Sequence, residues 1–210
     1  YITVRQLPPF FKYNNRIRYY LHEETETLDE IKHPSVRETA KFLNIKEGIE
    51  VVHNADLPAQ SGLGSSSTFT VGLLNALYGL KNYMPTKREL ALNAIHIEQD
   101  LIKESVGSQD QTAASFGGFN RIKFSKQKII DVDPILTSEK RLFELQNNLM
   151  LFFTGFARNA SDIAKDQIKI TLKKKRELKD IFDICSEGFS VLNDKKEPID
   201  RIGTLLNKQW

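Results

Sequence analysis

Residues 58–67 read Pro58-Ala59-Gln60-Ser61-Gly62-Leu63-Gly64-Ser65-Ser66-Ser67. They lie between a strand predicted over 49–55 and a helix predicted from Ser65. Apolar side chains recur along that helix at spacings of four, four and three residues, at Phe69, Leu73, Leu77 and Leu80. Glycine lets the backbone approach a ligand closely, and a helix start offers unpaired N–H groups and the positive end of the helix dipole. The stretch therefore predicts a phosphate-binding loop.

The hydroxyl cluster also has a simpler interpretation, a tight turn followed by a serine N-cap. A cap needs one serine and one glycine at most, whereas Ser65, Ser66 and Ser67 are consecutive. One of the three hydroxyls could also hold a metal ion. Two better-known glycine signatures fit badly, because the lysine of the Walker loop is absent and Gly62-Leu63-Gly64 lacks the third glycine of a dinucleotide fold.

The next predicted helix carries a carboxylate on its apolar side. On a wheel of about 100° per residue, Glu98 falls at about 80°, inside an apolar arc that runs from Leu90 through Leu101 and Ala94 to Ile102 at about 120°, whereas His96 and Lys103 fall on the opposite side. A carboxylate aimed inward is costly unless it is paired or bound to a metal. The pattern favours a magnesium ligand. The alternatives are an exposed glutamate at the edge of the stripe or a buried ion pair with an arginine.

The segment Gly107-Ser108-Gln109-Asp110-Gln111 follows the end of that helix. Asp110 has two interpretations on spacing alone. It is either a helix N-cap, for which aspartate is a favoured residue, or a general base that accepts a hydroxyl proton during phosphoryl transfer.

Composition bounds the remaining classes of function. The chain has 210 residues, 30 basic and 27 acidic side chains and a net charge of +3, too balanced for a nucleic-acid coat protein. We interpret the basic run Lys173–Arg176 as a solvated helix face.

The apolar run Leu149–Phe153 is far shorter than the roughly 20 residues that span a bilayer, so no membrane partner is expected. One cysteine, Cys185, excludes an internal disulfide, predicts a packed thiol and makes a reducing cytoplasm the expected location.

Turn signals and periodicity predict an α+β fold. The expected strands cover 1–5, 16–21 and 49–55, a hairpin covers 119–124 and 127–132, and a buried strand covers 149–154. Helices are expected from Pro34 to near Asn44, from Ser65, after Pro85 and from about 160 to 193. A polar stretch over 133–147 marks a domain boundary.

Taken in this order, residues 58–67, which we call the serine loop, the inward Glu98 and the Asp110-Gln111 pair resemble the GHMP kinases, the superfamily of galactokinase, homoserine kinase and mevalonate kinase. The resemblance implies an ATP- and Mg²⁺-dependent phosphotransferase. Its catalytic aspartate would be Asp110, and Ser66 with Glu98 would hold Mg²⁺. The residues expected to bind ATP are Pro58, Ser61, Gly62, Leu63, Gly64, Ser65, Ser66 and Ser67.

Four further segments resemble the D-glycero-D-manno-heptose 7-phosphate kinases within that superfamily: 7–11, 33–37, 106–111 and 116–120. The resemblance implies transfer of the ATP γ-phosphate to the anomeric hydroxyl of the heptose 7-phosphate, giving a 1,7-bisphosphate for activated-heptose synthesis. The residues expected at the sugar phosphate are Arg37, Gln111, Thr154, Gly155 and Arg158. Alternatives are a fucose- or galactose-type kinase and a non-catalytic regulator that binds a phosphosugar or nucleotide. No nucleic-acid partner is expected, and a homodimer is left open.

The same resemblance implies a GHMP kinase fold with a left-handed βαβ crossover and a ferredoxin-like C-terminal half. The expected domains are an N-terminal ATP-binding domain over 1–132 and the start of a C-terminal domain over 133–210. The family's first motif would precede Tyr1 and its third would follow Trp210, so the chain is expected to be truncated at both ends.

Overall fold

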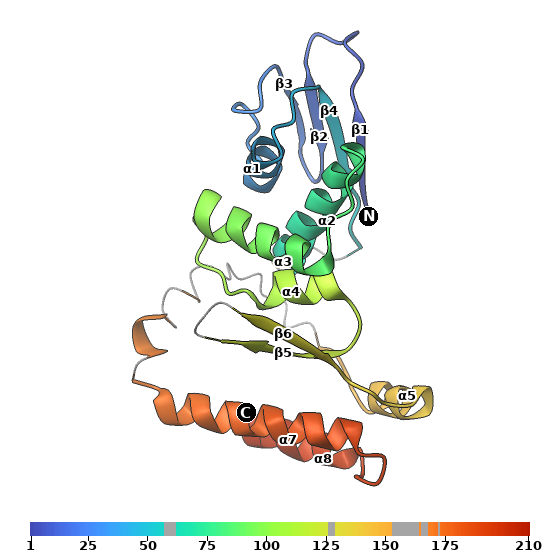
Figure 1. Cartoon of the computed structure of the whole chain (residues 1–210), viewed down its shortest axis with the longest axis vertical. Coiled ribbons are helices and arrows are strands. Elements are labelled where there is room, and N and C mark those ends of the chain that lie inside the picture. The colour runs from blue at the N-terminus through green and yellow to red at the C-terminus, as the bar shows by residue number, and fades with distance from the viewer. Residues whose placement is uncertain (57–61, 126–128, 153–163, 165–167, 172) are drawn as a thin grey trace. The chain divides into compact units, whose positions relative to one another are not determined.

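The computed structural model describes residues 1–56, 62–125, 129–152, 164, 168–171 and 173–210 (Figure 1). Its residues group into two compact units, Tyr1–Gly117 with Ala157–Ala164, and Gly118–Phe156 with Lys165–Trp210. This grouping places the predicted hairpin in the second unit. The family resemblance predicts a different boundary, between an ATP-binding domain that ends at residue 132 and a C-terminal domain that begins at residue 133. That boundary stays a prediction. Among the described helices, none has the length and hydropathy to cross a membrane.

A four-stranded sheet forms one layer of the first unit, with β1 (Ile2–Gln6), β2 (Asn15–Arg18), β3 (His22–Thr25) and β4 (Ile49–His53) in the order β1-β4-β2-β3. Strand β4 runs antiparallel to β1 and parallel to β2, and β3 runs antiparallel to β2. The strands expected near 1–5, 16–21 and 49–55 are confirmed. Strand β3 carries no aliphatic alternation, so periodicity does not reveal it.

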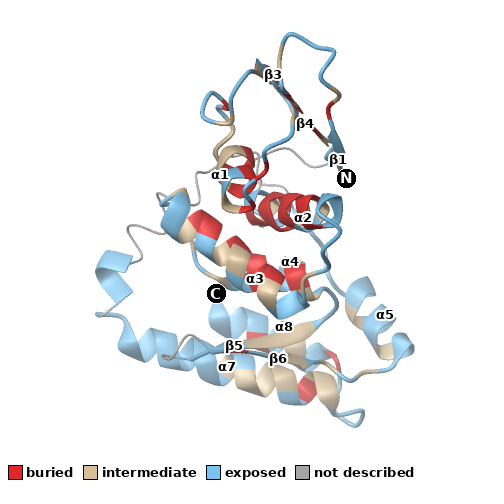
Figure 2. Cartoon of the chain, turned by 45° about the horizontal axis from the view of Figure 1, so that its top comes forward, coloured by how far each residue is buried: buried red, intermediate tan, exposed pale blue. Residues whose placement is uncertain are grey.

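Helix α2 (Ser65–Leu80) is the central helix of this unit, and Figure 2 shows the concentration of buried residues along it. It contacts β1, α1 (Pro34–Phe42), α3 (Lys87–His96) and α4 (Gln109–Phe116). The predicted stripe packs as expected at Phe69, Leu73 and Leu77, which are all buried, whereas Leu80 at the end of the stripe is exposed. Because α2 contacts both the sheet and the helices behind it, its first turn has a fixed position within the unit.

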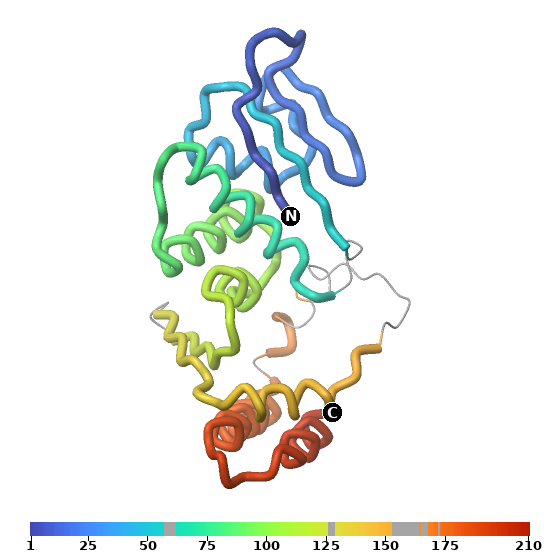
Figure 3. The backbone as a smooth tube through the Cα atoms, turned by 90° about the vertical axis from the view of Figure 1, so that its right-hand side faces the viewer, coloured from blue at the N-terminus to red at the C-terminus, as the bar shows by residue number. Residues whose placement is uncertain are grey.

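The second unit contains the antiparallel hairpin β5 (Asn120–Phe124) and β6 (Ile130–Pro134), which confirms that prediction. Its helices are α5 (Glu139–Asn147), α7 (Lys175–Asn193) and α8 (Asp200–Gln209), and α7 and α8 lie side by side (Figure 3). Cys185 is exposed on α7, so the prediction of a packed thiol is wrong. The buried strand predicted over 149–154 is also wrong in its described part, because residues 149–152 are exposed and pair with neither strand of the hairpin.

An ion triad centred on the buried Glu50 joins β1, β4 and β2. Glu50 stands in register with Arg5 of β1 and Arg16 of β2. Its Oε1 lies 2.6 Å from Arg16 Nε, and its Oε2 accepts a hydrogen bond from Arg5 Nε. Burial raises the pKa of Glu50, but the hydrogen bonds and charges of the two arginines outweigh burial and hold the pKa below its ordinary value of 4.5.

We expect Glu50→Gln to lower the free energy of unfolding by about 1.5–3 kcal/mol at neutral pH, as for hydrogen bonds to charged groups. Because the folded-state pKa of Glu50 is depressed, its contribution is present above about pH 4.5 and is lost as the pH falls through the folded value. Urea unfolding from about pH 7 to pH 3 should therefore show the gap between wild type and variant narrowing at low pH. A constant gap would contradict this. Glu47→Gln, at an exposed glutamate, is the control.

Candidate active site

The described part of the serine loop, residues 62–67, leads into α2, which begins without a side-chain cap. Gly62 and Gly64 have φ angles of +76° and +70°, in the left-handed region that favours glycine. Gly64 is the N-cap of α2, and the first helical hydrogen bond runs from the Thr68 N–H to the Gly64 carbonyl at 2.9 Å. The serine N-cap interpretation is therefore wrong. Instead, Ser65, Ser66 and Ser67 are the first three helical residues, whose N–H groups have no acceptor within a helix.

Asp110 packs directly against this loop. It belongs to the first turn of α4, where Ser108 is the N-cap, so the interpretation of Asp110 as a cap is wrong. A Cβ atom placed on Gly64 would lie 3.0 Å from Asp110 Cγ and 3.1 Å from its Oδ2. The absence of a side chain at Gly64 therefore lets an exposed carboxylate lie against the start of α2.

Glu98 lies beside these two elements and is 1% exposed, which confirms that it points inward. Its Oε2 accepts hydrogen bonds from Ser67 Oγ, at 2.8 Å, and from Gln111 Nε2. Its Oε1 is buried and has no hydrogen-bond partner in the described part of the chain. Among the described residues no arginine pairs with Glu98, so neither the ion-pair alternative nor the exposed-edge alternative holds there.

A π-helical turn brings Glu98 to this position. The segment η1 (Ile97–Leu101) continues α3, and the Ile102 N–H bonds to the Ile97 carbonyl five residues earlier, at 2.9 Å. The wider turn changes which side chains face inward. Leu101, expected on the apolar stripe, is 37% exposed. Turns of this type inside α-helices are frequently found at functional sites.

Glu104 is a second carboxylate close to Glu98. Its backbone N–H donates a hydrogen bond to the Glu98 carbonyl at 2.9 Å. The pKa of Glu104 is raised above its ordinary value, mainly by burial and also by the nearby charge of Glu98. Lys103, with a φ of +64°, turns the chain back at this point. Only the observed chain reversal after the π turn reveals this proximity.

The predicted metal-binding pair is arranged differently from the expectation. Ser67 contacts Glu98, whereas Ser66, expected beside Glu98, is exposed. One observation supports a divalent cation here: Oε1 of Glu98 is buried and has no partner among the described residues. Mg²⁺ is commonly held by one or two carboxylates together with substrate phosphates and water, so a single free carboxylate oxygen suits it. The assignment of Ser66 as a ligand stays a prediction.

The residues expected at the substrate are not brought together in the described structure. Arg37 donates from Nε to Glu38 Oε1 and from Nη1 to the Ile31 carbonyl, both at 2.8 Å. Gln111 is 0% exposed and bonds to Glu98. Their substrate roles stay predictions. Pro58, Ser61, Thr154, Gly155 and Arg158 lie outside the described residues.

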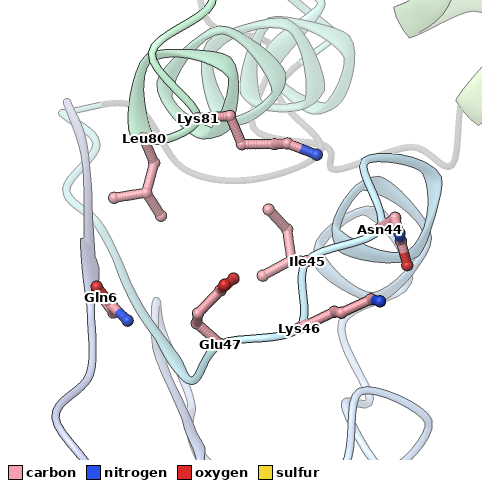
Figure 4. A pocket seen from close by; sticks show the side chains of 7 residues that line it. All are labelled: Gln6, Asn44, Ile45, Lys46, Glu47, Leu80 and Lys81. Atoms are coloured by element: carbon pink, nitrogen blue, oxygen red, sulfur yellow. The ribbon is translucent and has the colours of Figure 1, made fainter.

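A cavity of about 440 Å³ lies at the opposite end of α2 (Figure 4). Two of its lining residues, Leu80 and Lys81, lie roughly 22 Å along the helix from Ser65, at about 1.5 Å per residue. The cavity therefore belongs to a different part of the unit from the serine loop. It is lined by Gln6, Asn44, Ile45, Lys46, Glu47, Leu80 and Lys81.

Known structures share this fold. A structure titled as a D-glycero-D-manno-heptose 1-phosphate kinase from Bacteroides thetaiotaomicron superposes with a TM-score of 0.79 at 21% identity, over 100% of this chain and 65% of that one. A mevalonate kinase structure gives a TM-score of 0.62 at 16% identity, over 99% and 67%. The chain therefore has the α+β fold of the GHMP kinases.

Sequence comparison agrees with the fold. Residues 32–118 match the GHMP kinases N terminal domain. D-glycero-alpha-D-manno-heptose 7-phosphate kinase of Campylobacter jejuni is 34% identical over 161 residues, which are 74% of this chain and 46% of that protein. The chain belongs to the GHMP kinase family. It spans about half the length of this curated relative.

The neighbouring serines allow a matched test of the contact with Glu98. We expect Ser67→Ala to lower the free energy of unfolding by about 1.5–3 kcal/mol more than Ser66→Ala, because a buried carboxylate oxygen loses a donor only in the first variant. Both variants gain the same helix propensity, so this effect cancels. Urea unfolding measures the difference. Equal stabilities would show that the hydrogen bond from Ser67 to Glu98 contributes nothing.

Proposed function

We propose that the protein containing this chain transfers the γ-phosphate of ATP to a hydroxyl group of a sugar phosphate. One observation carries the proposal. The carboxyl of Asp110 packs on Gly64 at the start of α2, and Glu98 is bonded to Ser67 in the same first turn. Two further segments, η1 and the first turn of α4, thereby meet the start of α2.

Each segment has a separate task in this proposal. The N–H groups at the start of α2 and its positive dipole end hold the nucleotide phosphates. Glu98 holds Mg²⁺ through Oε1. When bound, Mg²⁺ neutralises charge on the phosphate oxygens. Most of the rate enhancement then comes from positioning and from charge stabilisation.

Asp110 acts on the acceptor. Its exposed carboxylate accepts the proton of the sugar hydroxyl as the hydroxyl oxygen bonds to the γ-phosphorus. The bond from that phosphorus to the bridging oxygen breaks, and ADP leaves with the electron pair. The products are ADP and the phosphorylated sugar, with the proton on Asp110.

For the acceptor we propose the anomeric hydroxyl of D-glycero-D-manno-heptose 7-phosphate, which gives the 1,7-bisphosphate. The support is the 34% identity to a relative named as a heptose 7-phosphate kinase. A fucose- or galactose-type kinase is the second candidate within the family. A regulator without turnover would need neither Glu98 nor Asp110 at the loop, so the presence of both favours an enzyme.

We expect Asp110→Asn in the full-length protein to lower kcat by about 10²–10⁴-fold, the usual contribution of a general base. Nucleotide affinity should change little, because the loop and α2 are unaltered. Steady-state kinetics and binding of a fluorescent ATP analogue measure the two effects. The control is Asp100→Asn, at an exposed aspartate that pairs with His96. Near-normal turnover by a folded Asp110→Asn protein would remove the base assignment.

The substrate is tested by ³¹P NMR of the full-length protein with Mg-ATP and a panel of sugars and sugar phosphates. We expect a new anomeric phosphate signal with heptose 7-phosphate, and a kcat/KM for this substrate above that for fucose or galactose. A higher kcat/KM for a free hexose would replace the heptose assignment and retain the kinase. No phosphorylation of any sugar would contradict the proposed activity.

A further inference from the structure

The two hydrogen-bond donors at Glu98 both act on the same oxygen. Ser67 Oγ and Gln111 Nε2 donate to Oε2, from α2 and from the first turn of α4, while Oε1 has no partner in the described part of the chain. A freely rotating carboxylate would offer a cation either one oxygen or both. Here one oxygen is occupied by two protein donors, so only the other is available.

Gln111 has no other evident use in the described structure. Its side chain is 0% exposed, its amide nitrogen bonds to Glu98, and no described residue donates to its Oε1. The amide must present its NH₂ group to the carboxylate, because the reverse orientation would place two acceptors against each other. A residue buried and bonded in this way is placed to orient Glu98.

We propose that Gln111 is a positioning residue that makes Glu98 a one-oxygen ligand and thereby selects Mg²⁺ over Ca²⁺ at the nucleotide. This inference rests on the proposed function, since it takes Glu98 as the magnesium ligand. Mg²⁺ demands near-octahedral geometry and accepts single carboxylate oxygens, whereas Ca²⁺ takes six to eight oxygens and accepts carboxylates through both. A carboxylate limited to Oε1 suits the smaller ion.

The position of Gln111 also links this selection to the catalytic segment. Asp110 packs on Gly64, and the next residue along α4 bonds to Glu98. The first turn of α4 therefore contacts both the loop and the carboxylate. Groups that orient a metal ligand typically change metal affinity by about 10- to 100-fold when they are removed.

The test measures the affinity of a fluorescent, non-hydrolysable ATP analogue for the full-length protein, once with saturating Mg²⁺ and once with saturating Ca²⁺. The readout is the ratio of the two dissociation constants. We expect Gln111→Met, which keeps the length of the side chain and removes the donor, to reduce the preference for Mg²⁺ about 10-fold. Gln111→Asn, one methylene shorter, is the second variant if the first does not fold. Ser67→Ala should change the ratio in the same direction.

Two further variants separate the possible failures. The control is Ser115→Ala. Ser115 is on α4 like Gln111, and its buried hydroxyl has no partner among the described residues, so this variant should keep the wild-type ratio of the two dissociation constants. Glu98→Gln should weaken binding with both metals. If Glu98→Gln changes nothing, the magnesium site of the proposed function is wrong. If Glu98→Gln weakens binding while the folded Gln111 variants keep the wild-type ratio, the positioning role of Gln111 is overturned.

Discussion

The site depends on one constraint, a buried carboxylate of which the described residues satisfy only one oxygen. Transferring a charged group from water to a protein interior costs several kcal/mol unless hydrogen bonds or an opposite charge compensate. Glu98 has two donors on Oε2 and none from the described residues on Oε1. Three elements converge to create this arrangement. Helix α2 supplies Ser67, the π turn supplies the carboxylate, and α4 supplies Gln111. A cation at Oε1 would provide the compensation that the described residues leave out.

The rest of the first unit holds the start of α2 in place. Its buried face carries Phe69, Leu73 and Leu77 and contacts the sheet, α1, α3 and α4. The sheet is itself held across its middle by the ion triad centred on Glu50. Gly64 then allows the carboxyl of Asp110 to approach the helix start closely. Hydrophobic packing therefore determines where the helix lies. The close approach of Asp110 to Gly64 and the hydrogen bond from Ser67 to Glu98 determine which functional groups meet its first turn.

Periodicity was sufficient to predict some of this structure. The start of α2, its buried stripe and the inward direction of Glu98 follow from apolar spacing at 3.6 residues per turn. Periodicity does not predict that Ser67, and not Ser66, contacts Glu98, because this depends on where η1 lies relative to α2. The exposure of Leu101 and the approach of Glu104 to Glu98 require the π turn, which a wheel of constant angle cannot represent. Strand β3 was missed because its buried residue is Glu23, which accepts hydrogen bonds from the backbone N–H groups of Lys32 and His33.

The most direct test of the account is a crystal structure of the full-length protein with Mn²⁺ and a non-hydrolysable ATP analogue, in which anomalous scattering locates the metal. We expect the metal at about 2.1 Å from Glu98 Oε1, a distance close to that of Mg²⁺–oxygen bonds, with Ser67 and Gln111 still donating to Oε2. A metal held elsewhere, with a protein donor filling the place beside Oε1, would contradict the account.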